Sequence, residues 1–311
     1  MVYSPAVRII PEGSLAYGLQ LPIQSQSELY VADWERTCGA AELAAIAEAA
    51  DRSGFHYVAV CDHVAIPRDL AGAMGTTWYD PVATLGFLAG RTERVRLLSH
   101  VYVAPLRPPL QSAKHFATLD HLSGGRVIVG VGTGHVRAEF DALGVDFTRR
   151  GRLLDEAIDV LAASLADEFV GDVGLRPRPV QSPRPPIWVG GSSPAALRRV
   201  AGRGDGWLPQ GTPRDDMPGQ IAAIRQHQER LGREEPLDLG AITEPVYVGD
   251  ADWKVGRRTL TGSGEAIAES LRAYGEMGCS HLQVRFRARS LEEQLDQMEA
   301  FGTDVGPLLS A

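Results

Sequence analysis

The chain has 311 residues, of which 44% are hydrophobic and 23% charged, a composition typical of a globular protein with a sizeable core. Its net charge of -8 argues against nucleic acid as the main partner. The three cysteines lie far apart with no CxxC spacing, which favours a reducing cytoplasm over a disulfide framework or a zinc site. There is no signal-peptide pattern and no run of about 18 apolar residues, so we expect no membrane partner.

Short apolar runs alternate with helical patterns along the chain, in an order that defines a fold. The expected strands span 17–22, 57–63, 94–103, 126–134, 187–191, 206–209, 239–248 and 281–286. The expected helices span 39–53, 108–122, 151–165, 194–201, 217–231, 265–277 and 291–301, with one more that begins at Asp80-Pro81, an N-cap followed by proline.

This alternation predicts parallel strands joined by helical crossovers. Eight is the number of strands that closes a barrel whose side chains fill its interior. An open, doubly wound sheet is the alternative, although it is more often built from two lobes. We therefore predict one (β/α)8 TIM-barrel domain over residues 1–311, with an irregular lead-in at 1–14 and an irregular proline-rich insertion at 167–186.

The second strand ends in Asp62-His63, where such a barrel places its chemistry. A histidine here can take or give a proton, because its reference pKa lies near neutrality. Neighbouring residues on a strand point to opposite sides, so Asp62 and His63 need not touch each other. An ordinary strand-end cap is the alternative interpretation.

The third and fourth strands also end in candidate residues. His100 is either a functional group at the mouth or a hydrogen-bonded core histidine. Gly132, Thr133 and Gly134 form a glycine-rich turn where a ligand could approach the backbone, or where the chain merely leaves the strand. The spacing does not complete the dinucleotide pattern GxGxxG, which argues against a Rossmann site.

The fifth strand runs into Gly190, Gly191 and Ser192, just before a helix that Pro194 begins. Backbone N–H groups and the positive end of a helix dipole favour phosphate at such a turn. Arg198 and Arg199, in the first turns of the helix, and Arg203, which follows it, support that interpretation, with a solvated basic helix face as the alternative. No metal-ligand spacing and no GxSxG elbow occurs, so we expect neither a metal site nor a serine hydrolase.

Two longer segments carry a family resemblance. They read LSHVYVAPLRPPLQSAKHFATLDHLSGGRVIVGVGTGHVRAEFDALGVDF and PRPPIWVGGSSPAALRRVAGRGDGWLP. With GLQLP in the first strand and CDHVAIP in the second, they resemble the luciferase-like family of flavin- or deazaflavin-dependent oxidoreductases over nearly the whole chain. The resemblance implies a (β/α)8 barrel, usually dimeric, with an isoalloxazine-type ring at its mouth.

The resemblance also implies roles for particular residues. An Asp-His pair after strand two is similar to the branch that uses coenzyme F420, so Asp62 and His63 are expected to face the ring and act in catalysis or cofactor placement. A non-prolyl cis peptide is expected at His100-Val101, behind the ring. The resemblance further implies that Gly132, Thr133 and Gly134 line the cofactor's polar side chain, and that Gly190, Gly191 and Ser192 bind its phosphate.

The substrate pocket is less defined. The chain is short around residues 167–175 compared with the family pattern, which would leave the pocket more open. Trp78 and Tyr79, in the loop after strand two, are candidates to line it, and simple packing is the alternative.

These observations support three functional hypotheses. The first is a cytoplasmic, homodimeric, F420-dependent oxidoreductase that transfers a hydride between the deazaflavin and a small organic substrate, with His63 in the proton role. The second is an FMN-dependent monooxygenase that uses oxygen and needs a separate flavin reductase. The third is a barrel that binds a flavin-like ligand without turning it over.

Overall fold

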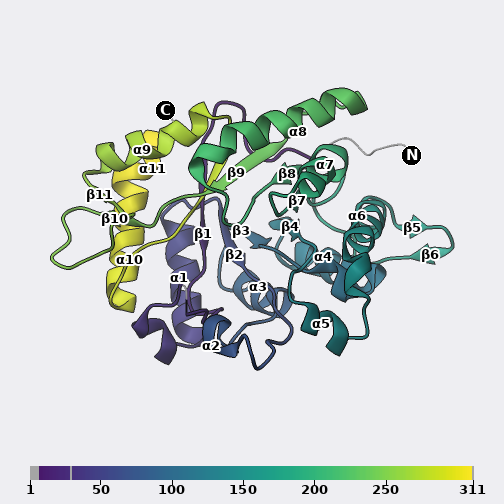
Figure 1. Ribbon diagram of the computed structural model, residues 1–311, viewed down its shortest axis with the longest axis horizontal. Helices are drawn as coiled ribbons and strands as arrows, with labels where there is room; N and C mark the ends of the chain where they lie inside the picture. Colours follow the sequence, from purple (N-terminus) through teal and green to yellow (C-terminus); the bar gives the residue numbers. More distant parts are fainter. Residues whose placement is uncertain (1–6, 29, 310–311) are drawn as a thin grey trace.

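The computed structural model describes residues 7–28 and 30–309 and contains a closed barrel of eight parallel strands (Figure 1). Their order around the barrel is β1-β12-β9-β8-β7-β4-β3-β2. The strands span β1 (Ala16–Gln20), β2 (Tyr57–Val60), β3 (Arg96–Ser99), β4 (Val127–Val131), β7 (Ile187–Val189), β8 (Gly206–Trp207), β9 (Asp238–Ile242) and β12 (His281–Val284). The predicted (β/α)8 fold is confirmed.

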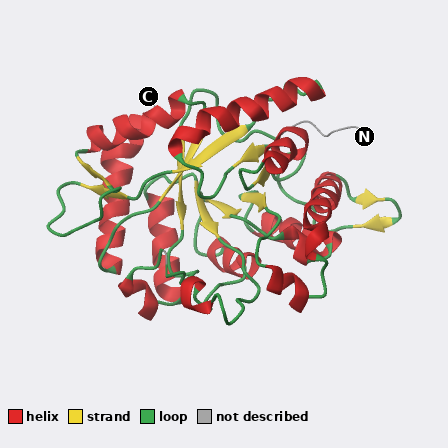
Figure 2. Cartoon of the chain, viewed as in Figure 1, coloured by secondary structure: helices red, strands yellow, loops and turns green. Residues whose placement is uncertain are grey.

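Helices surround the strands and cover the outside of the barrel (Figure 2). The helices span α1 (Ala40–Arg52), α2 (Ala71–Met74), α3 (Pro81–Ala89), α4 (Pro109–Leu122), α5 (Arg137–Ala142), α6 (Arg150–Ala166), α7 (Pro194–Arg203), α8 (Met217–Leu231), α9 (Gly264–Glu276), α10 (Leu291–Ala300) and α11 (Gly306–Leu309). Among the described residues, no helix combines the length and apolar character that crossing a bilayer requires.

Local sequence explains where the helices begin and which face they bury. The Asp80 carboxylate accepts a hydrogen bond from the Ala83 N–H at 2.9 Å, and Pro81 is the first residue of α3, as predicted. Helix α1 buries Leu43 and Ile46, which recur at helical spacing and pack in the layer between strands and helices.

Alternate residues of β2 face two different apolar layers. Tyr57 and Ala59 pack in the small cluster that fills the barrel, whereas Val58 and Val60 pack against the surrounding helices. This period of two is the geometry of an extended strand. Continued past Val60, it sends successive side chains of the following loop to opposite sides of the barrel wall.

Two expected boundaries are corrected by the structure. The strand expected over 239–248 is two strands, because Pro245 lacks the N–H that a ladder needs: β9 stays in the barrel, and β10 (Val246–Val248) pairs with β11 (Leu260–Gly262) outside it. The insertion at 167–186 is not irregular throughout, since β5 (Phe169–Val170) and β6 (Val173–Gly174) form a projecting hairpin (Figure 1). Residues 7–14 contain no helix or strand, and residues 1–6 of the expected lead-in lie outside the described residues.

Candidate active site

His63 lies at the barrel mouth, in the loop after β2, and its side chain is held by a carboxylate from a distant part of the chain. Its Nδ1 lies 2.8 Å from Oε2 of Glu139, a buried residue of α5. The other oxygen, Oε1, accepts hydrogen bonds from the backbone N–H groups of Val64 at 2.7 Å and Ala65 at 3.2 Å. Glu139 therefore fixes both the imidazole and the loop that carries it.

The electrostatics of this pair define the protonation of the imidazole. Burial raises the pKa of the Glu139 carboxyl, but the hydrogen bonds from His63, Ala65 and Val64 outweigh it and leave that pKa below its usual value. An ionised carboxylate only accepts, so Nδ1 of His63 carries the proton in this bond. Within the described residues no protein group binds Nε2, which is thus available to a ligand.

Aromatic rings set the plane of the His63 imidazole. Trp78 packs edge-on against it with centroids 4.4 Å apart, and His135 does so at 5.5 Å. Burial, together with the nearby His63, lowers the pKa of His135. Of the two expected pocket aromatics, Trp78 lies at His63, whereas Tyr79 packs against the main hydrophobic core.

Asp62 lies on the other side of the wall from His63. Asp62 is buried, with 5% of the residue exposed. Its carboxylate accepts two hydrogen bonds from the Arg107 guanidinium, at 2.5 and 2.9 Å. A third comes from the backbone N–H of Val103 at 2.8 Å. Asp62 and His63 thus have different partners, because the strand's alternation directs Asp62 toward the loop after β3. Their expected place beside the ring stays a prediction.

The peptide bond between His100 and Val101 is cis, as the resemblance implied. His100 is buried, which lowers its pKa to about 4, so its Nε2 donates as a neutral imidazole to the Leu208 carbonyl at 3.1 Å. The structure therefore places His100 as a neutral, hydrogen-bonded histidine below the mouth.

The glycines after β4 and β7 make room for the Val101 side chain. A Cβ added to Gly132 or to Gly190 would lie 2.5 Å from a Val101 methyl group. Gly134, at a φ of +71°, is likewise crowded by Val103. Half-buried Val101 thus forms an apolar surface between the two glycine turns. In this structure the glycines make space for a side chain of the protein, whereas the sequence suggested that they let a ligand approach the backbone.

The turn after β7 presents donors at the start of α7. Ser193 caps this helix by accepting from the Ala196 N–H at 3.2 Å, and Gly191, at a φ of +89°, accepts from the Trp207 indole at 2.8 Å. In the described part of the chain, the N–H of Ser192 has no acceptor. Thr133, in the facing turn, is half-buried.

Two of the three arginines of α7 bind carboxylates of α6 and not this turn. Arg199 binds Asp155 at 2.7 Å and Arg203 binds Asp159 at 2.9 Å, both on α6, and Arg198 is exposed. The interpretation of these side chains as partners of a phosphate is corrected: two of them tie α7 to α6.

A polar network inside the mouth, which was not predicted from the sequence, connects β1, β12 and the end of β2. The Gln20 amide donates to the Cys61 sulfur at 3.0 Å, and its oxygen accepts from Gln283 at 3.1 Å and from Arg285 Nε at 3.0 Å. The available signal was a polar residue at the end of an apolar strand, in GLQLP and HLQVRF. Glu139 gave no such signal, because it lies 76 residues from His63.

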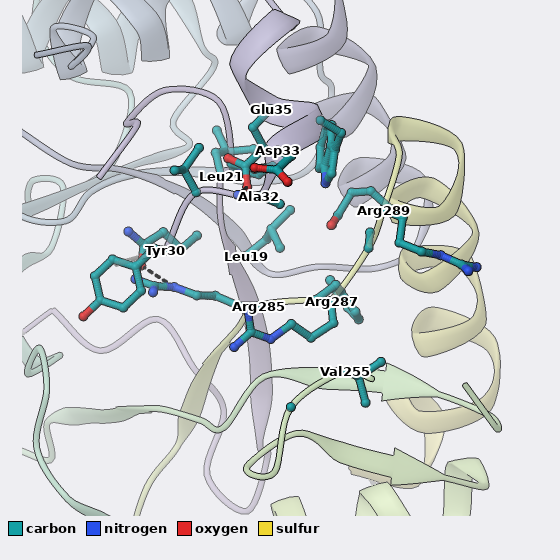
Figure 3. Close-up of a pocket in the computed structure, with 18 of the residues that line it drawn as sticks. Leu19, Leu21, Tyr30, Ala32, Asp33, Glu35, Val255, Arg285, Arg287 and Arg289 are labelled. Atoms are coloured by element: carbon teal, nitrogen blue, oxygen red, sulfur yellow. Dashed lines mark hydrogen bonds between the residues drawn. The ribbon is translucent and has the colours of Figure 1, made fainter. Parts of the chain in front are cut away.

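A cavity of about 490 Å³ opens beside this network (Figure 3). The segments after β1 and β12 form its walls together with residues 253–256. Its lining includes Gln20, and also Ser25, which forms a β-bridge with Trp78. The cavity therefore adjoins the residues that hold His63.

Comparisons with known proteins agree with this architecture. An uncharacterized protein of Mycobacterium tuberculosis is 32% identical over 259 residues, covering 75% of this chain and 91% of that protein. The FMNH(2)-dependent dimethylsulfone monooxygenase of Pseudomonas putida is 30% identical over 209 residues, covering 63% and 56%. The coenzyme F420 dependent tetrahydromethanopterin reductase of Methanopyrus kandleri superposes with a TM-score of 0.73 at 18% identity, covering 95% and 99%. The family model described as luciferase-like monooxygenase matches residues 17–257, and the chain belongs to this family.

Proposed function

We propose that the protein is an F420-dependent oxidoreductase that transfers a hydride between the deazaflavin and a small organic substrate. The observation that carries the proposal is a histidine at the barrel mouth whose Nδ1 is held by Glu139 and whose Nε2 is free for a ligand. When bound, the deazaflavin supplies the hydride acceptor or donor. His63 supplies the accompanying proton or takes it up at Nε2.

The residues of the mouth fit a ring with an anionic side chain. Val101 offers an apolar surface for a flat ring between the glycine turns. The free N–H of Ser192 and the start of α7 suit a phosphate. Gly132, Thr133 and Gly134 lie on the facing turn, where they would line the rest of the cofactor's side chain.

Each neighbouring residue has a supporting task. Glu139 keeps the proton on Nδ1 of His63 and stabilises the imidazolium that forms when Nε2 takes a second proton. Asp62, through Arg107 and the Val103 N–H, fixes the loop that carries Val101. Asp62 is thus a positioning residue, and His63 is the catalytic one.

A second candidate function is an FMN-dependent monooxygenase fed by a separate flavin reductase. The relative that favours it is the P. putida FMNH(2)-dependent enzyme, at 30% identity. The glycine turns and the α7 start suit an FMN phosphate equally well. The third possibility, a barrel that binds a flavin-like ligand without turnover, gives no reason for a carboxylate-held histidine.

A titration of the apo-protein with F420 and, separately, FMN tests the proposal. Trp78 lies against His63, so intrinsic fluorescence reports on binding, and a Trp78→Phe variant identifies its share of the signal. Preference for F420, followed by redox exchange with added donors or acceptors, supports the proposal. Preference for FMN moves the function to oxygen chemistry, binding without redox exchange supports the ligand-binding barrel, and binding of neither refutes all three.

The expected assembly is a separate proposal. We infer a cytoplasmic homodimer from the family resemblance alone. Size-exclusion chromatography with light scattering tests it, and a monomer at micromolar concentration would contradict it.

A further inference from the structure

The half of the mouth formed by β8, β9, β12 and β1 is rich in cations. Arg285, Arg287 and Arg289 follow β12, and Arg257 and Arg258 lie on the segment before β11. They line the cavity of about 490 Å³ and an adjoining one of about 830 Å³, which share Arg285 and Arg287 in their walls. This concentration of positive charge contrasts with the chain's net charge of -8.

Most of these cations have no carboxylate partner in the described residues. Arg289 is the exception, since it binds Asp252 at 3.0 Å and Glu293 at 2.9 Å. In Figure 3 its side chain points away from Arg285 and Arg287. Within residues 7–28 and 30–309, the side chains of Arg257, Arg258 and Arg287 form no ion pair.

The carboxylates that line these cavities are engaged elsewhere. Glu35 accepts from the backbone N–H groups of Ile23 at 2.8 Å and Ala32 at 2.9 Å. Asp33 faces Arg36 at 3.7 Å. Glu244, in the larger cavity, accepts from the Tyr274 hydroxyl at 2.9 Å. Of these carboxylates, Glu35 lies near enough to favour the charged form of Arg285, while Arg287 has no ion-pair partner among the described residues.

Arg285 is the most constrained of the cations. It donates to the Gln20 amide oxygen, and its guanidinium carbon lies 4.2 Å from the centre of the Tyr30 ring (Figure 3). It is half-buried and has no ion-pair partner among the described residues, since the Glu35 carboxylate acts on it only at longer range. A guanidinium taken partly out of water is costly without a counter-ion, and its fork of donors matches carboxylate or phosphate.

The cation-rich half lies opposite the turns assigned to the cofactor. His63, Val101, Gly132 and Gly190 follow β2, β3, β4 and β7, four consecutive strands of the barrel. The cations follow β12 and β9, two of the other four strands. The two halves meet at Gln20, which contacts both Arg285 and Cys61, two residues before His63. Arg285 therefore adjoins the half of the mouth that carries His63.

We propose that the substrate is an organic anion whose carboxylate or phosphate binds Arg285, with Arg287 beside it in the shared wall. This inference rests on the proposed oxidoreductase function, and it names the class of substrate for that site. The charged group anchors the molecule on the β12 side, while its uncharged part extends toward the ring and His63.

The test compares a charged probe with an uncharged copy of the same shape. Isothermal titration calorimetry of the apo-protein and of the cofactor-loaded protein measures binding of 3-phenylpropionate, 3-phenylpropionamide and phenyl phosphate. We expect both acids to bind at least tenfold more tightly than the amide, and the preference to weaken with added salt. We expect Arg285→Gln to reduce the preference to within about twofold, and Arg287→Gln to reduce it in part.

The control is Arg230→Gln, which removes an exposed charge of α8 away from the cavities and should leave the preference unchanged. Thermal unfolding checks that each variant is folded. If Arg285→Gln does not fold, the Arg287→Gln variant still provides the test. Equal binding of acid and amide, or a preference that survives both substitutions, overturns the proposal. If the acids and the cofactor compete for binding, the arginines bind the cofactor's own side chain, and this result also overturns the proposal. The apo-protein data stand even if F420 fails to bind, so the two proposals fail separately.

Discussion

Replacing Glu139 by glutamine tests the core of the site with a nearly isosteric change. The amide oxygen is expected to keep the bonds from the Val64 and Ala65 N–H groups, because they need an acceptor. The amide NH2 then faces Nδ1 of His63, which can accept only without its proton. The imidazole is forced into the tautomer protonated at Nε2, the atom we assign to proton uptake.

The structure sets the size of the effect. When Nε2 and Nδ1 of the imidazole are both protonated, the amide NH2 cannot replace the carboxylate at Nδ1, and such a hydrogen bond to a charged group contributes about 1.5–3 kcal/mol. Since about 1.4 kcal/mol corresponds to tenfold in rate, we expect turnover to fall by about 10- to 100-fold. Cofactor affinity should change by less than about threefold, because Glu139 lies behind the imidazole and outside the glycine turns.

Two measurements check this reasoning. Steady-state kinetics give the fall in kcat, with Glu292→Gln, an exposed change on α10, as the matched control. Nitrogen-15 NMR of labelled histidine identifies the tautomer directly and does not depend on activity. A variant with unchanged tautomer and kcat within about twofold of the parent would refute the role given to Glu139.

Three further predictions concern stability. Asp62→Asn removes the buried carboxylate that binds Arg107 and leaves only the more exposed Asp80 carboxylate, at 3.6 Å. The free energy of unfolding in urea should therefore fall by about 3 kcal/mol, and a loss under about 0.5 kcal/mol would contradict the pairing. Gly190→Ala places a methyl group 2.5 Å from Val101 and should lower the free energy of unfolding by about 1–3 kcal/mol. Adding Val101→Ala should restore most of this stability, and an equal loss in the single and the double variant would argue against the contact. The pKa of Glu139 is lowered in the folded protein, so its stabilising contribution is present above the usual glutamate pKa and is lost as pH falls through the folded value. The stability difference between the parent and Glu139→Gln should therefore shrink on acidification from pH 6 to pH 3, and a constant difference would contradict the shift.

The strand ends are the part of the site that local pattern predicts well. Apolar runs of strand length placed His63, Val101, Gly132 and Gly190 at one end of a parallel barrel, since every strand of such a barrel ends at the same face. The expected boundaries over 239–248 and 167–186 were wrong because in each a single residue determines the local backbone structure. Pro245 interrupts a ladder, and Gly171, at a φ of +60°, allows a tight hairpin in a proline-rich stretch.

What the sequence by itself determined is the barrel and the positions at its mouth, because periodicity and turn residues are local properties. Only the tertiary structure decided which of those residues work together. It brought Glu139 to His63 from 76 residues away, and sent Asp62 to Arg107 instead. It also gathered arginines from separate loops around two adjoining cavities. Such pairings depend on distances between segments remote in the chain, which are set by closure of the barrel and not by any short run of residues.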